Sequence, residues 1–232
     1  MNWLKFKRTT YRSRYHLLLI SLIFVVFGDL MFPTHPDIYQ TYTRPLWSLF
    51  SVLAGWNLVH KNKNKNYAYA LILTLLACGE IINLFRPIQS LSLIKQFGYM
   101  GFFIIFSLEL FNQIRTAKKV TNSTLTAVLC GLIIIGIAGG IGATLIEYFH
   151  PQSFQGAISE DPIINFQYFS FITLSTVGYG DITPITLYAK KFTILLTLTG
   201  NFYTIVIIGV IIGKYTSTKI IDEEKHKNKK VE

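Results

Sequence analysis

The chain has 232 residues, of which 51% are hydrophobic and 15% charged, and its formal net charge is +10. This balance is too apolar for an ordinary soluble domain. The basic residues gather near the ends and in alternate gaps between apolar runs, which indicates membrane topology with cytoplasmic termini and contact with anionic lipid rather than a nucleic-acid surface. Six apolar runs approach or reach the length that crosses a bilayer, at residues 15–32, 45–60, 67–85, 97–114, 125–149 and 187–213.

The first four runs predict a four-helix transmembrane bundle over residues 1–114. Ionisable side chains inside such a bundle need partners, or must reach the interface with their polar ends. The candidates are Asp29, Glu80 and Arg86 near the outer ends, and Glu109 with Arg14, His16 or Lys61 near the inner ends.

A shorter helical run lies between the fifth and sixth apolar runs. Asp161 and Pro162 have the residue types of an N-cap and a first-turn proline. The run from Ile163 to about Ser175 is too short to cross a bilayer. It therefore predicts a re-entrant helix, whose C-terminal end directs the negative pole of its dipole toward the residues that follow. Glu147, near the outer end of the fifth run, is predicted to be a packing contact.

The next residues, 173–180, read Thr-Leu-Ser-Thr-Val-Gly-Tyr-Gly and precede Asp181. A tight glycine-rich turn between two helices would explain the glycines alone. The re-entrant helix favours another interpretation, in which Gly178 and Gly180 take left-handed dihedrals so that successive carbonyls face one axis. Val177 and Tyr179 would then turn their side chains into the surrounding protein.

Thr176 to Gly180 resemble the selectivity filter of tetrameric potassium channels, in which backbone carbonyls replace the water shell of the ion. The resemblance implies K⁺ bound by oxygens of Thr176, Val177, Gly178 and Tyr179, with no other cofactor. One chain supplies only about a quarter of each ion cage, so it also implies a homotetramer.

The resemblance covers about residues 125–215 and implies a hinge in the inner helix at Gly200. A packing glycine is the alternative explanation, and it applies at least equally to Gly209 and Gly213. An inner narrowing lined by isoleucines would close by dewetting. The residues that helical spacing places on the cavity and then at this narrowing are Asn201 and Thr204, followed by Ile208 and Ile212.

Three features depart from the family pattern. Tyr168 and Phe169 replace the tryptophan pair that often braces the filter, which puts filter stability in doubt. Ile172 replaces a glutamate that in some bacterial members pairs with the aspartate at Asp181, so Asp181 is predicted to rely on Tyr168 or water. The Pro-x-Pro kink of many animal voltage-gated members is missing, so bending would depend on Gly200.

The fourth run, 97–114, has no arginine or lysine. A voltage-sensing helix needs several, because one charge crossing the field contributes only about 2.3 kcal/mol per 100 mV. We therefore predict a subunit that resembles voltage-gated potassium channels in layout, with weak or no voltage dependence. The alternatives are an atypical sensor using Arg86 and Lys95, a potassium uptake transporter subunit, although those chains carry four degenerate filter repeats, and a sensory role for the first four helices.

These inferences predict an all-α membrane protein with six transmembrane helices, a re-entrant pore helix and a filter loop, assembled as a four-fold tetramer. We expect a potassium-selective channel rather than an enzyme or a nucleic-acid-binding protein. Its expected location is a plasma membrane, bacterial by composition, in contact with lipid. The predicted divisions are a bundle at 1–114, a linker at 115–124, a pore domain at 125–216 and a cytoplasmic tail at 217–232, with a frayed end from Asp222.

Overall fold

The computed structural model of the chain describes residues 2–31, 46, 49–50, 74–79, 82, 89–117, 120–156 and 162–228. The described part is mainly helical and also contains a two-stranded antiparallel sheet, which the all-α prediction did not include. In chain order its main elements are α1 (Asn2–Phe27), the 3-10 helix η1 (Gly28–Met31), α5 (Gln89–Thr116), α6 (Asn122–Phe149), β1 (Phe154–Gly156), α7 (Pro162–Leu174), β2 (Ile182–Pro184) and α8 (Leu187–Asn228).

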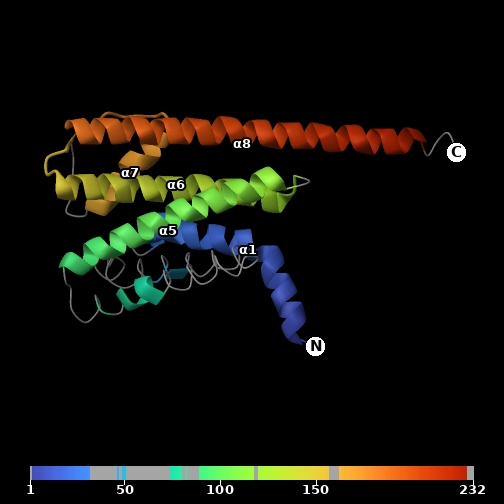
Figure 1. Cartoon of the computed structure of the whole chain (residues 1–232), viewed down its shortest axis with the longest axis horizontal. Coiled ribbons are helices and arrows are strands. Elements are labelled where there is room, and N and C mark those ends of the chain that lie inside the picture. The colour runs from blue at the N-terminus through green and yellow to red at the C-terminus, as the bar shows by residue number, and fades with distance from the viewer. Residues whose placement is uncertain are drawn as a thin grey trace.

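Helix α6 lies at the centre of this arrangement and contacts α1, α5, α7 and α8. Figure 1 shows α7 crossing α6, with one end beside α8, and α5 and α1 on the side of α6 away from α8. A large apolar cluster that includes Phe102, Phe106 and Ile134 joins α1 and α5 to α6. A second cluster joins Phe154 of β1 to Phe166 of α7. We call the end of α6 to α8 that carries the two strands the sheet end.

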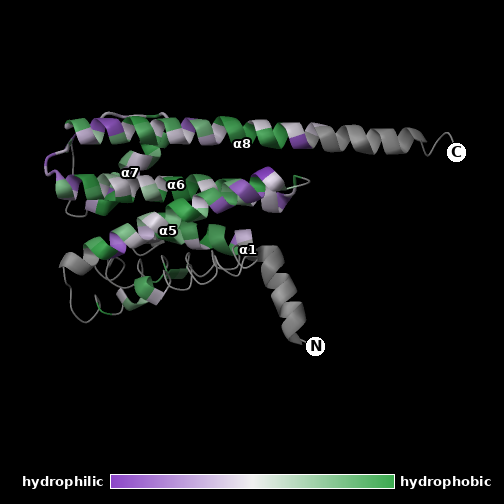
Figure 2. Ribbon diagram, viewed as in Figure 1, coloured by the Kyte–Doolittle hydropathy of each residue, from purple (hydrophilic) through white to green (hydrophobic). Residues whose placement is uncertain are grey.

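Three helices of the described part are long and apolar enough to cross a membrane, at Leu93–Thr116, Asn122–Phe149 and Leu187–Lys214. Figure 2 shows apolar residues along α6 and along the first part of α8. These helices coincide with the predicted fourth, fifth and sixth runs. Helix α1 holds a shorter apolar stretch, Tyr15–Phe27. The predicted runs at 45–60 and 67–85 lie mostly outside the described residues.

Glycines on α6 let α7 pack closely against it. A Cβ added to Gly140 would lie 2.7 Å from the Cα of Gln167, which is backbone that cannot move aside. One added to Gly136 would collide with the ring of Phe171. Small residues at helix contacts are the usual means by which membrane helices approach closely, so these glycines set the position of α7.

The chain reverses sharply between α5 and α6. Thr121 caps α6 in a reciprocal box with Thr124, in which each backbone N–H donates to the other's hydroxyl at 3.3 Å. The connection is residues 117–121, which is shorter than the predicted linker at 115–124.

The expectation of a frayed end from Asp222 is wrong for most of that segment. Helix α8 continues to Asn228. The segment after Asp222 is rich in glutamate and lysine, and these straight-chain residues have high helix propensity. The composition of this segment suggested disorder. A helix that has already formed upstream extends more easily than a new helix forms, and composition does not reflect this.

Candidate functional site

The loop after α7 begins as a tight continuation of that helix. The carbonyl of Ile172 accepts hydrogen bonds from the backbone N–H of Val177 at 2.9 Å and of Gly178 at 3.2 Å. The N–H of Thr176 donates to the carbonyl of Thr173 at 3.1 Å. These bonds satisfy carbonyls at the end of α7 that no helical partner reaches, and they fix where the loop leaves the helix. Helix α7 itself covers the predicted run of 163–175 to within one residue at each end.

The backbone of the loop alternates in sign. Thr176, Gly178 and Gly180 have φ values of 59°, 52° and 82°, while Val177 and Tyr179 between them do not have positive φ. A Cβ added to Gly178 or Gly180 would meet no atom within 4 Å. Glycine is therefore required here for its left-handed dihedral and not for space. Thr176 takes the same conformation at a cost, since residues with a Cβ rarely adopt it.

The loop side chains face outward in the single chain. Val177 is 51% exposed and Tyr179 is 73% exposed. Large apolar side chains at this exposure, on a loop fixed from behind by α7, form a surface that a neighbour can cover. The sequence predicted that surrounding protein covers them, and this stays a prediction.

Asp181, directly after the loop, is tied to α7. The Tyr168 hydroxyl donates to its Oδ2 at 2.7 Å, and the N–H of Ile182 donates to its Oδ1 at 3.1 Å. The hydrogen bond to this carboxylate raises the pKa of Tyr168 to about 12, so the phenol stays protonated and remains a donor at neutral pH. Tyr168 is thus a partner of Asp181 in this chain, where the glutamate of some bacterial members is missing.

The other predicted supports behind the loop are buried. Phe169 is 3% exposed and packs edge-on against Phe154, with ring centroids 5.2 Å apart. Ile172 is 9% exposed and contributes its carbonyl, as described above.

Gly156 of β1 lies against the residue that ends the loop, and sequence reasoning missed it. Its φ is 137°, and a Cβ there would collide with the backbone carbonyl of Asp181. Gly156 also pairs with Ile182 across the sheet. The loop is therefore held from two sides, by α7 through Tyr168 and by β1 through backbone contact that leaves room only for glycine.

Glu147 anchors the segment that leads into β1. Its Oε1 accepts from the N–H of Gln152 at 2.7 Å, and its Oε2 accepts from the N–H groups of Ser153 at 3.0 Å and Phe154 at 3.1 Å. The carboxylate thus satisfies three backbone donors. Glu147 was predicted to make a packing contact, but its carboxylate makes hydrogen bonds to the backbone. Hydrogen bonds to a charged acceptor are stronger than ordinary packing contacts.

A second link at the sheet end joins this segment to the start of α8. The carbonyl of Ser153 accepts from the N–H of Ile185 at 2.7 Å. The hydroxyls of Ser153 and Thr186 are 2.9 Å apart, and Ser153 is fully buried. The rings of His150 and Tyr188 stack with centroids 4.1 Å apart. No local sequence signal predicts these pairs, since each joins residues far apart along the chain.

Gly200, the predicted hinge, lies at a close approach between helices. A Cβ there would be 2.6 Å from Leu174 Cδ2 and 3.3 Å from the Leu174 backbone at the end of α7. Figure 1 shows α8 as a straight helix without a visible bend. The packing alternative is therefore supported at Gly200, and the hinge stays a prediction. Gly209 and Gly213 differ, because a Cβ at either would meet nothing within 4 Å in the single chain.

The predicted cavity and narrowing residues share one exposed side of α8. Asn201 and Thr204 are exposed, and so are Ile208 at 51% and Ile212 at 59%. Tyr203 and Ile207 are buried toward α6. The four predicted residues are therefore exposed in the single chain, on the side of α8 that does not pack against α6.

Lys214, near the end of the membrane-spanning part of α8, makes a contact that sequence reasoning missed. Its Nζ donates to the carbonyls of Ile114 at 2.8 Å, Arg115 at 2.6 Å and Ala117 at 2.6 Å. An ammonium carries three donors, and here they cap the C-terminal end of α5, where the helix dipole is negative. Helix α8 is thereby tied to the C-terminal end of α5.

Glu109, the acidic residue of α5, accepts from Gln113 Nε2 at 3.1 Å. The Oε1 atom of Gln113 accepts in turn from the Tyr15 hydroxyl at 2.7 Å. This chain of hydrogen bonds joins α5 to α1. Lys61, one of the partners predicted for Glu109, lies outside the described residues. Glu80 and Arg86, which were predicted to form a separate cluster with Asp29, lie outside them as well.

Comparison with known proteins finds similarity to ion channels over the region that contains the loop. Residues 132–217 match a family model described as an ion channel. This range contains most of α6 and all of α7 and the loop. No solved structure matches the chain.

Three similar curated proteins are potassium channels of Arabidopsis thaliana. Two-pore potassium channel 2 is 28% identical over 101 residues, covering 43% of this chain and 22% of the relative. Channel 5 is 33% identical over 81 residues, covering 34% and 19%. Channel 4 is 35% identical over 88 residues, covering 38% and 29%. The chain thus spans less than a third of the length of these relatives.

Together these matches support the potassium channel class, which is a class of ion-transport proteins and not of enzymes. The apolar helices agree with a protein that crosses the membrane several times.

Proposed function

We propose that this chain is the pore-forming subunit of a potassium-selective channel. The observation that carries the proposal is the loop 176–180, whose φ angles alternate in sign although nothing crowds its glycines. An unstrained turn would not need left-handed dihedrals at three alternate positions. A stack of carbonyls facing one axis needs them.

In this mechanism K⁺ leaves water and enters a file of oxygens from Thr176, Val177, Gly178 and Tyr179. Carbonyl dipoles compensate the lost hydration without a fixed charge that would trap the ion. The C-terminal end of α7 points its negative dipole end at the path. Four copies of the chain close the cage, and neighbouring subunits cover Val177 and Tyr179. K⁺ moves passively down its electrochemical gradient.

The remaining parts follow from this assignment. The sheet end is the outer end, and both chain termini are cytoplasmic. Ile208 and Ile212 line the inner narrowing, with Gly200 as the point about which α8 bends. Helix α5 has no arginine or lysine between residues 97 and 114, so the channel opens with little or no voltage dependence. The N-terminal bundle acts on the pore through contacts such as that of Lys214.

The test is the reversal potential of the purified protein in a planar bilayer with opposed K⁺ and Na⁺ gradients. We expect reversal near the K⁺ equilibrium potential and an open probability that changes little with voltage. A nonselective current would contradict the filter. A selective current that switches steeply with voltage would contradict the account of α5.

A matched pair of variants isolates the loop backbone. A Cβ meets no atom within 4 Å at either Gly178 or Gly101, but Gly178 has positive φ whereas Gly101 lies inside α5. We expect Gly178→Ala to lower the K⁺ over Na⁺ permeability ratio at least tenfold, equivalent to about 1.4 kcal/mol of lost discrimination. Gly101→Ala should leave the ratio unchanged. Equal ratios in the two variants would contradict the proposed filter conformation.

A further inference from the structure

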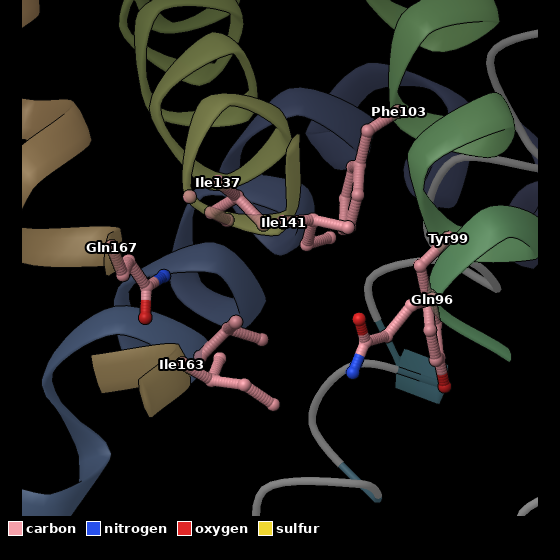
Figure 3. A pocket seen from close by; sticks show the side chains of 9 residues that line it. Gln96, Tyr99, Phe103, Ile137, Ile141, Ile163 and Gln167 are labelled. Atoms are coloured by element: carbon pink, nitrogen blue, oxygen red, sulfur yellow. The ribbon is translucent and has the colours of Figure 1, made fainter. Parts of the chain in front are cut away.

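A cavity lies between the N-terminal helices and the pore helices. Its volume is about 120 Å³, and its walls come from α1, α5, α6 and α7. Figure 3 shows Gln96 of α5 and Gln167 of α7 on opposite sides, with Ile141 and Ile163 between them. Anything bound here touches both halves of the chain.

Among the described residues that line the cavity, none has a charged side chain. Most of the lining is aliphatic or aromatic, including Val25, Phe103, Ile137 and Ile141. One polar atom stands out, because Gln96 Oε1 is buried and accepts no hydrogen bond within the described part of the chain. A buried acceptor without a donor is unfavourable and calls for an explanation.

We propose that this cavity binds a small uncharged molecule that is mainly apolar and carries one hydroxyl group. The apolar walls exclude ions and hold a hydrocarbon body, and the hydroxyl donates to Gln96 Oε1. An apolar protein cavity of about 150 Å³ holds a benzene molecule, and this cavity is somewhat smaller at about 120 Å³. A single six-membered ring with one hydroxyl is therefore the upper limit of size for the occupant. Such a molecule partitions into a bilayer and reaches the site from the membrane.

The position of the cavity connects its occupant to the filter. Gln167 and Ile163 are the walls contributed by α7. Gln167 directly precedes Tyr168, whose hydroxyl holds Asp181 at 2.7 Å. Close packing of Gly140 on the Gln167 backbone leaves α7 little room to adjust locally. A molecule bound in the cavity therefore acts through α7 on Tyr168 and the filter, in addition to filling space. This consequence depends on the proposed channel function.

Binding is tested first on the full-length protein in detergent micelles, with phenol as the probe and benzene as the matched ligand without a donor. Ligand-observed NMR titration should show saturable binding of phenol. Gln96→Leu should weaken phenol about fivefold, the loss of one hydrogen bond, and leave benzene unchanged. Equal weakening of both ligands, or no saturable binding of phenol, overturns the proposal.

A space-filling variant shows that the ligand occupies this cavity. Ile141→Phe should abolish saturable binding of phenol and benzene, whereas Ile105→Phe, at a position 45% exposed on α5, should abolish neither. If Ile141→Phe does not fold, Val25→Phe fills the cavity from α1 instead. Binding that survives in a folded filled variant places the ligand elsewhere and overturns the site.

The functional consequence is measured as single-channel open probability in a planar bilayer. Phenol should change the open probability of the wild type and of Ile105→Phe, and not that of Ile141→Phe. Saturable binding with no such change in a conducting protein overturns the link to the filter. A protein that binds phenol but conducts no K⁺ overturns the proposed function while the binding site stands, so the two failures are distinguishable.

Discussion

At the sheet end, the loop 176–180 is held by many short contacts from different elements, whereas at the opposite end α8 is tied to α5 by the side chain of Lys214. Glu147, Tyr168 and Gly156 each fix backbone or side-chain atoms around the loop. A structure that holds carbonyls at the distance at which they bind an ion needs many contacts around them. A helix end that opens and closes needs few bonds to break. In the proposed channel, this difference divides selectivity and gating between the two ends.

The most damaging change to the sheet end is expected at Gly156. Gly156→Ala places a Cβ against the Asp181 carbonyl at a φ of 137°, a conformation almost confined to glycine. We expect a loss of about 3 kcal/mol in the free energy of unfolding, with loss of K⁺ selectivity. Thermal unfolding of the purified protein measures the first, and reversal potential the second. Gly101→Ala is the control, and equal stability of both variants would show that the contact is not rigid.

Glu147→Gln should have a smaller effect at the same end. The amide keeps one acceptor oxygen but loses the charge that serves three backbone donors, so we expect the protein to lose about 1 to 3 kcal/mol in the free energy of unfolding. Glu109→Gln is the matched control, because an amide can still accept from Gln113. Chemical unfolding monitored by Trp fluorescence compares the two. If Glu109→Gln lowers the free energy of unfolding as much as Glu147→Gln does, Glu147 has no special role as an anchor.

Lys214→Met tests the opposite end. Residues two apart on a helix lie about 200° apart around it, so Lys214 holds α8 by the face opposite Ile212. Without the tie, apolar contact between isoleucines should draw α8 toward the axis and lower the open probability about tenfold, with an unchanged reversal potential. Lys191→Met removes the same charge at the sheet end of α8 and serves as the control. A raised open probability, or a shifted reversal potential, would refute the division between the ends.

The smallest expected effect concerns the exposed bond of Tyr168. Its pKa is raised to about 12 by the hydrogen bond to Asp181. The neutral phenol is therefore the form that the folded protein stabilises, and its contribution is complete below about pH 10 and lost as pH rises through about 12. Without this bond the filter should be less stable. We therefore expect the K⁺ current through the open channel to decay about threefold faster in Tyr168→Phe than in the wild type at pH 8. The wild type should approach this rate toward pH 12, and rates that stay apart there would exclude the bond as the cause.

Local chemistry is what made parts of this structure predictable. Pro162 and the apolar residues after it gave the bounds of α7, and the repeated glycines gave the sign of φ at 178 and 180, because both signals act within a few residues. The contacts of Gly156 with Asp181 and of Lys214 with α5 were not predictable, since each joins distant segments whose proximity depends on the fold. Gly200 shows the same limit, because spacing along one chain could not distinguish a bend from close packing on Leu174.

The short connection at 117–121 and its capping by Thr121 have a consequence for how the proposed ring is built. Two helices joined by so few residues must turn back on each other as an antiparallel hairpin. In the proposed tetramer, the N-terminal helices of each chain therefore pack on their own α6 and cannot reach across to a neighbour's. Each proposed subunit is then a self-contained wedge, and a stimulus received by one bundle would act on one quarter of the proposed conduction pathway.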